Sequence, residues 1–170
     1  GLKAGVTRGE FERRIQDGTV ADCFCRLPVR AGDAMFLPSG RVHALGAGSV
    51  LFEIQQNSDT TYRVFDWNRV GLDGRPRELH VSQSLTSIDF NDFEPALITS
   101  RYSRSPTIKV RYLVDDPMFM VNACLVKRGQ RFHLRIQTPQ IIGVMRGRLR
   151  VGQGEGAVTL TAGQFCLVPA

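Results

Sequence analysis

The sequence lacks several features that would assign it to a broad class of protein. No stretch approaches the roughly 18 consecutive apolar residues of a membrane-spanning helix. No apolar run follows Lys3, so neither a membrane span nor a signal peptide is expected. Charges of one sign never form a long run, and the aromatic-plus-basic pattern of common RNA-binding modules is missing. We therefore expect no nucleic-acid partner, and the net charge of +6 suits a small anionic ligand equally well.

Cysteine is also scarce and irregularly placed. The four cysteines are Cys23, Cys25, Cys124 and Cys166. They form no C-x-x-C pair and no regular framework. We expect them to be small buried hydrophobic side chains in a reducing compartment, not metal ligands or disulfides. This usage, with the missing signal peptide, favours a cytoplasmic protein.

Short β-like segments dominate the 170 residues after Pro28. Before them, Thr7 and Glu10 form a capping box for one helix, which Gly18 can end. The segments rich in Val, Ile, Phe and Tyr are 33–38, 49–56, 61–67, 109–114, 118–127, 141–145, 147–152, 157–160 and 164–168. Evenly spaced strands with few helices predict an all-β sandwich or barrel.

A histidine in a frame of glycine and proline is the first candidate site. Gly32 is followed after five residues by Pro38, then by Gly40 and, after two more residues, by His43. This spacing resembles the second conserved motif of the cupin superfamily, G-x5-P-x-G-x2-H-x3-N, with Ala47 where asparagine is usual. A tight turn after the proline would place the histidine on the returning strand. A neutral imidazole there can bind a divalent metal.

A longer and more specific match covers residues 50–80, which read VLFEIQQNSDTTYRVFDWNRVGLDGRPRELH. They contain the strings E-x-Q-x-x-S-D-x-T-Y-R-x-x-D-x-x-R and D-G-x-P-R-E-L-H. The matching residues are Glu53, Gln55, Ser58, Asp59, Thr61, Tyr62, Arg63, Asp66, Arg69, Asp73, Gly74, Pro76, Arg77, Glu78, Leu79 and His80. The region resembles the signature of type I mannose-6-phosphate isomerases of the bacterial kind. Arg41 departs from that pattern, because a small residue, usually threonine, is common there. We expect it to add positive charge beside His43.

A partial match to the first cupin motif, H-x-H-x3-4-E-x6-G, lies further along the chain. His133 and Gly147 keep their places, but Arg135 replaces the second histidine and Gln140 replaces the glutamate. This second cupin should therefore hold no metal, and a structural role is expected for His133. The resemblance predicts a two-cupin arrangement: a helical linker at 1–28, the distal part of the first, catalytic cupin at 29–85, a connector at 86–108, and a degenerate second cupin at 109–170 that is incomplete at its C-terminus.

The resemblance also implies an activity and roles for four residues. These enzymes interconvert mannose 6-phosphate and fructose 6-phosphate by moving a proton between C1 and C2 through an enediol. It implies His43 as a ligand of zinc, with the remaining ligands, a Gln-x-His pair and a glutamate, expected outside this chain. Arg63 would be both catalytic and substrate-binding, and Arg77 would bind the phosphate. Glu53 would be a catalytic carboxylate.

Other interpretations stay open. Glu53 and Arg63 could form only a buried ion pair. The residues that could form a network locking the connector are Arg69, Arg77, Glu78 and His80. The leading hypothesis is the distal portion of a longer isomerase with a sugar-phosphate substrate and an undetermined oligomeric state. The alternative is a non-catalytic cupin module that binds a sugar or a sugar phosphate.

Overall fold

The chain forms two compact units. The computed structural model describes residues 1–67, 69–134 and 137–170. The first unit is Gly1–Leu125 and the second is Val126–Ala170. This border differs from every border expected from the sequence, and the assignment of the segments to two cupins stays a prediction. Within the described ranges, no helix combines the length and the apolar character that crossing a bilayer requires.

The first helix, α1 (Arg8–Gln16), begins and ends where the sequence predicts. The Oγ1 atom of Thr7 accepts a hydrogen bond from the backbone N–H of Glu10 at 3.2 Å. This bond satisfies one of the donors left free at a helix start. The carboxylate of Glu10 does not complete the predicted capping box, because it accepts from Nε of Arg14 instead, at 2.9 Å. Gly18, with φ of +72°, adopts the left-handed conformation that commonly ends a helix.

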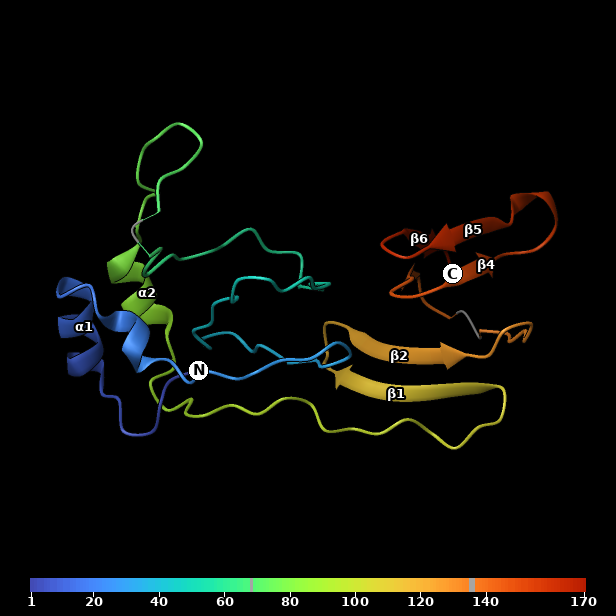
Figure 1. Cartoon of the computed structure of the whole chain (residues 1–170), viewed down its shortest axis with the longest axis horizontal. Helices are drawn as coiled ribbons and strands as arrows, with labels where there is room; N and C mark the ends of the chain where they lie inside the picture. Colours follow the sequence, from blue (N-terminus) through green and yellow to red (C-terminus); the bar gives the residue numbers. More distant parts are fainter. Residues whose placement is uncertain (68, 135–136) are drawn as a thin grey trace. The chain divides into compact units, whose positions relative to one another are not determined.

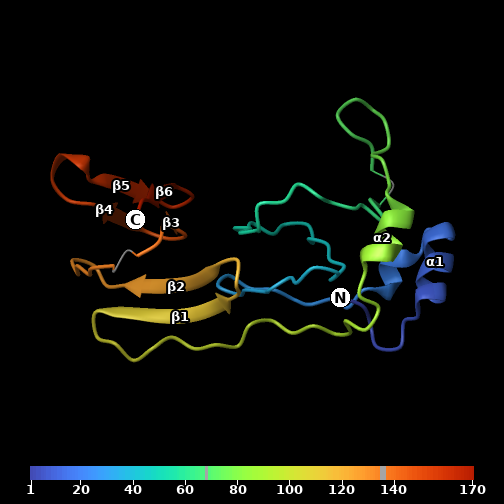
Figure 2. The ribbon, with the colours of Figure 1, turned by 180° about the vertical axis from the view of Figure 1, so that it is seen from behind.

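The core of the first unit surrounds Phe11. Its almost fully buried side chains are Leu2, Phe11, Val20 and Cys23. The ring of Phe11 packs edge-on against Phe24 and Phe90, at centroid distances of 6.0 and 5.6 Å. Leu85, from helix α2 (Val81–Ser87), packs against the same cluster. The two helices lie side by side in both views (Figures 1 and 2), and the short 3-10 helix η1 (Val20–Cys23) joins them in this core.

The strands expected at 33–38, 49–56 and 61–67 are not formed. This part of the chain carries no strand among its described residues and runs as irregular backbone (Figure 1). Several of its apolar side chains stay uncovered: Val50, Leu51 and Ile54 are exposed, whereas Val64 is buried in the core. A strand exists only when a neighbour accepts and donates its backbone hydrogen bonds in a continuous ladder. The described residues here form only isolated backbone bonds, such as those from Ile98 to Ala34 and from His80 to Arg63. The prediction of strands in these three ranges is therefore wrong, because the pairing that would make strands of them is missing.

The strands β1 (Ile108–Asp115) and β2 (Met120–Val126) form a two-stranded sheet and run in opposite directions (Figure 1). Arg111 ties this sheet to the rest of the first unit. Its guanidinium donates to the backbone carbonyls of Gly32 and Ile98, both at 2.7 Å. A planar guanidinium with five donors suits such a junction of loops.

The second unit contains two antiparallel strand pairs (Figure 2). Its elements are β3 (Gln140–Gly143), β4 (Arg148–Val151), the 3-10 helix η2 (Gly154–Gly156), β5 (Val158–Thr161) and β6 (Phe165–Val168). In register, Gly143 faces Phe165, and Arg148 faces Thr161. Each of these strands lies within a few residues of its predicted position. The strands β4 and β5 form a hairpin, and β3 and β6 pair across it.

Candidate functional site

A tight turn positions the histidine of the cupin-like motif. The N–H of Arg41 donates to the carbonyl of Pro38 at 3.1 Å, which closes the turn. Gly40 has a φ of +88°, and a Cβ on it would lie 3.1 Å from the carbonyl oxygen of Ser87. The N–H of Asp89 donates to the carbonyl of Gly40 at 2.9 Å. Glycine is therefore required both by the backbone conformation and by the close approach of the segment that follows α2.

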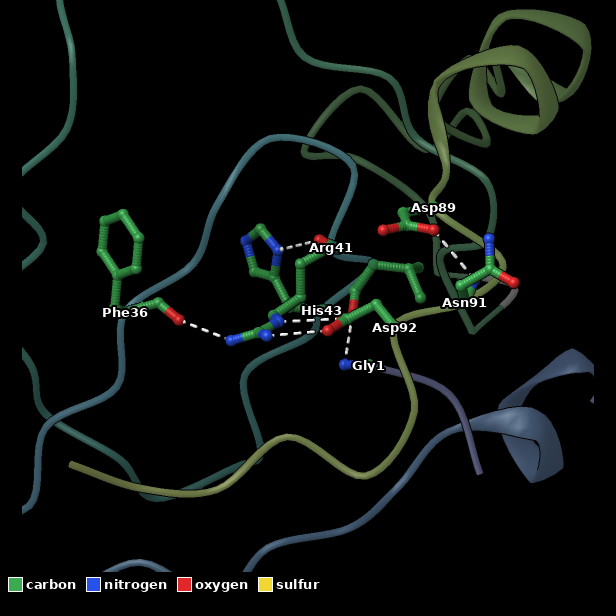
Figure 3. A network of polar contacts seen from close by, with 8 residues as sticks. Gly1, Phe36, Arg41, His43, Asp89, Asn91 and Asp92 are labelled. Atoms are coloured by element: carbon green, nitrogen blue, oxygen red, sulfur yellow. Dashed lines mark hydrogen bonds and ion pairs between the residues drawn. The ribbon is translucent and has the colours of Figure 1, made fainter. Parts of the chain in front are cut away.

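His43 lies just after this turn, with its ring exposed to solvent. Its Nδ1 atom lies 3.0 Å from the backbone carbonyl oxygen of Arg41 (Figure 3). A carbonyl oxygen only accepts, so Nδ1 carries the proton in this contact. The Nε2 atom has no hydrogen-bond partner within the described ranges, and in the neutral ring it keeps its lone pair. One nitrogen of the predicted metal ligand is thus available.

Arg41 does not add free positive charge beside His43, contrary to expectation. Its Nε and Nη2 atoms bind the two carboxylate oxygens of Asp92, at 2.8 and 2.7 Å. Its Nη1 atom donates to the carbonyl of Phe36 at 2.8 Å. The hydrogen bond from Arg41 holds the pKa of Asp92 below its ordinary value, and the same bond raises the pKa of Arg41. Sequence reasoning missed Asp92 because no local pattern links two residues so far apart along the chain.

Arg63 is held beside the D-G-x-P-R-E-L-H string. The N–H of His80 donates to the carbonyl of Arg63 at 2.7 Å, and Nδ1 of His80 accepts from the N–H of Arg63 at 3.3 Å. The Nη1 atom of Arg63 donates to the carbonyl of Glu78 at 3.1 Å. The structure thus brings together two strings that the sequence matched separately, and Arg63 keeps other guanidinium donors available.

Asp66 is a buried carboxylate at the centre of an arginine cluster, and sequence reasoning assigned it no role. Arg69 forms a very short hydrogen bond to its Oδ1, and Nη1 of Arg77 lies 3.9 Å from its Oδ2. The hydrogen bond from Arg69 lowers the pKa of Asp66, and the charges of Arg77 and Arg63 act in the same direction. Arg77 remains half exposed. This arrangement agrees with an ion-pair network for Arg69 and Arg77, with Asp66 as the shared anion.

Glu53 is not brought to these arginines. Its side chain is exposed, and the described residues show no ion pair between Glu53 and Arg63. The alternative of a buried pair between them is therefore wrong for this structure. The sequence pattern could not decide this point, because Glu53 lies in the segment whose expected strands are unformed.

The described residues do not complete a zinc site. In residues 1–67, 69–134 and 137–170, no three His, Cys, Asp or Glu side chains gather where they could hold a metal ion. Zinc takes about four ligands in structural sites and three in catalytic ones, so His43 alone does not fit the ion. That the other ligands lie outside this chain stays a prediction. In the second unit His133 is exposed, and Arg135 lies outside the described residues.

Comparison with known proteins bears on the family. No family model matches the chain. The mannose-6-phosphate isomerase of Streptococcus mutans serotype c is 31% identical to it over 165 residues, which are 96% of this chain and 51% of the relative. The chain is similar to this isomerase over nearly its whole length. The mannose-6-phosphate isomerase ManA of Bacillus subtilis is 32% identical over the same shares of the two chains. The chain therefore spans about half the length of the curated relatives it matches.

The crystal structure of the mannose 6-phosphate isomerase from Bacillus subtilis shares the fold. It matches 99% of this chain and 53% of its own, with a TM-score of 0.79 and 24% sequence identity. The prediction of an all-β cupin fold of the isomerase type is thereby confirmed. Because that likeness shows the fold alone, the roles of Arg63, Glu53, Arg77 and His43 remain predictions.

Proposed function

We propose that this chain takes part in the interconversion of mannose 6-phosphate and fructose 6-phosphate, as one portion of an isomerase. The observation that carries the proposal is the similarity to two named isomerases over 96% of the chain. It is supported by the place of His43, whose Nε2 is exposed and unshared at the end of the cupin-like turn. Free thiols and a phosphorylated substrate fit a reducing compartment, and we place the protein in the cytoplasm.

The reaction needs a group that moves a proton between C1 and C2 and groups that hold negative charge on the substrate oxygens. We assign to Arg63 the stabilisation of negative charge on the substrate oxygens. Its guanidinium is fixed through the carbonyl of Glu78 and retains free donors. We assign binding of the substrate phosphate to Arg77. Its side chain is half exposed, and its contact with Asp66 is long, at 3.9 Å. Glu53 is the candidate for proton handling, since its carboxylate is exposed and unpaired among the described residues.

Zinc dependence is part of the proposal, with His43 as one ligand. The described residues provide no complete site, so the other ligands must come from elsewhere, and no catalytic step is assigned to the ion.

A second candidate function is a module that binds a sugar phosphate without turnover. The missing ligand set favours it, because Arg63 and Arg77 could hold a phosphate in the absence of metal.

The experiment is a coupled assay for fructose 6-phosphate, run with and without zinc. It uses this chain alone and this chain fused to the half of the Streptococcus mutans isomerase that it does not match. We expect zinc-dependent turnover in the fused protein, abolished by His43→Ala and retained in His133→Ala, the matched histidine control. A folded fusion that binds mannose 6-phosphate without turnover would support the binding module. A folded fusion with neither binding nor turnover would overturn both.

A further inference from the structure

The ring of His43 is held by the backbone of Arg41, and Arg41 is itself held by side-chain contacts (Figure 3). Neutral histidine in water favours the tautomer with the proton on Nε2. Here the contact with the Arg41 carbonyl oxygen, at 3.0 Å, requires the proton on Nδ1. The contact therefore selects the less common tautomer and leaves the lone pair on the exposed nitrogen.

Several contacts fix the carbonyl that makes this selection. The turn closes through the hydrogen bond from Arg41 to Pro38, and Gly40 is docked on Asp89. On the side-chain side, every type of guanidinium nitrogen of Arg41 is used, with Nε and Nη2 on Asp92 and Nη1 on the carbonyl of Phe36. Three of the five N–H donors of Arg41 are therefore engaged in holding the turn.

The ion pair is sheltered enough to hold its geometry. The side chains of Arg41 and Asp92 are only 17% and 16% exposed, whereas the pairs on the surface of α1 are more open. A two-pronged contact between a guanidinium and a carboxylate fixes orientation as well as distance. Through Asp92, the turn that carries His43 is anchored to the segment after α2, which the Phe11 core holds by way of Phe90.

We propose that Arg41 and Asp92 are positioning residues for His43. Their ion pair fixes the peptide whose carbonyl oxygen holds the His43 ring as the Nδ1–H tautomer, with the Nε2 lone pair presented to solvent. Use of that lone pair as a ligand atom rests on the proposed function, whereas the tautomer does not.

The tautomer is measured directly by two-bond proton–nitrogen correlation spectra of the histidine rings in the ¹⁵N-labelled chain. The spectra are recorded on the alkaline plateau of the histidine signals, where they no longer change with pH. Signals of His43 are assigned by their loss in His43→Ala, which separates them from those of His80 and His133. We expect the Nδ1 resonance of His43 to be that of a protonated nitrogen and Nε2 that of an unprotonated one.

Two substitutions test the positioning role. Asp92→Asn removes the anion, and Arg41→Thr removes the guanidinium; in each we expect His43 to revert to a mixture dominated by the Nε2–H tautomer. Asp89→Asn is the matched control, because its carboxylate only accepts from the N–H of Asn91 and does not touch Arg41. It should leave the His43 signals unchanged. If either variant fails to fold, Arg41→Lys, which keeps the charge but cannot form the two-pronged contact, should still raise the Nε2–H fraction.

The outcomes separate this inference from the isomerase proposal. An Nε2–H tautomer in the unsubstituted chain overturns the inference whatever the activity of the fused enzyme. An Nδ1–H tautomer that persists in Asp92→Asn, Arg41→Thr and Arg41→Lys overturns the role of the ion pair. If the tautomer follows the ion pair while the fused enzyme is inactive, the positioning role stands and the isomerase proposal fails.

Discussion

Arg41 and Asp92 lie 51 positions apart in the sequence and are joined by two parallel hydrogen bonds of 2.8 and 2.7 Å. The contact ties the turn before His43 to the segment after α2. Asp92 supplies the counter-ion that the largely buried guanidinium of Arg41 needs.

The ion pair should contribute measurably to stability. We expect Asp92→Asn to lower the free energy of unfolding by about 2 kcal/mol, because a hydrogen bond to a charged group is lost and the arginine is left without its anion. Asp89→Asn, which changes the same charge three residues earlier, should stay within about 0.5 kcal/mol of the unsubstituted chain. Urea unfolding followed by circular dichroism measures both, and equal effects would show that the pair has no special role.

Stability should fall on the acid side of neutrality. The pKa of Asp92 is held below its ordinary value of 3.8 by the hydrogen bond from Arg41, and that of Asp66 by the one from Arg69. A carboxyl group with a lower pKa in the folded state stabilises that state above the ordinary pKa. The stabilisation is lost as the pH falls through the folded-state pKa.

We therefore expect the free energy of unfolding to be insensitive to these two groups near neutral pH and to drop below about pH 4. In Asp92→Asn the drop should be shallower, since one of the two carboxyl groups no longer titrates. The measurement is a series of urea unfolding curves across this range. A steeper drop in the variant would contradict the assignment.

A side chain at Gly40 should destabilise the protein more than a side chain at another glycine of the same backbone conformation. Gly40 and Gly48 have φ of +88° and +79°, but only at Gly40 would a Cβ meet backbone atoms, at 3.1 Å from Ser87 and 3.2 Å from Asp89. Alanine at either position costs about 1–2 kcal/mol for the left-handed backbone. Gly40→Ala should cost about 1 kcal/mol more from the close contact. Equal losses in thermal or urea unfolding would show that the turn is not docked as described.

Truncation of Phe11 should destabilise the first unit severely. Phe11→Ala removes a fully buried ring that contacts Phe24 and Phe90, and we expect a loss of about 3–5 kcal/mol. Leu72→Ala removes a fully exposed apolar side chain and should change stability by less than about 0.5 kcal/mol. Unfolding monitored by near-ultraviolet circular dichroism gives the comparison. A small loss for Phe11→Ala would mean that the cluster is not a core.

Local features of the chain were determined by the sequence alone. The hydroxyl of Thr7 and the backbone freedom of Gly18 act within one turn of the helix they bound, so α1 could be located from residue types. The strands of residues 140–168 lie within one short stretch of the chain, where β3 and β6 pair across the β4–β5 hairpin, and alternating apolar side chains were sufficient to find them. The spacing of Gly32, Pro38, Gly40 and His43 likewise indicated the cupin-like motif and the turn.

Tertiary structure alone decided which distant residues meet. The partner of Arg41, the carbonyl that holds Arg63 and the separation of Glu53 from Arg63 depend on how segments far apart in sequence pack, and no residue type encodes them locally. In the segment at 33–67, the composition is typical of strands, but no strands form. A strand requires a partner edge to complete its backbone hydrogen bonds. Residue types determine what each segment can form, and the neighbours it finds in three dimensions determine what it does form.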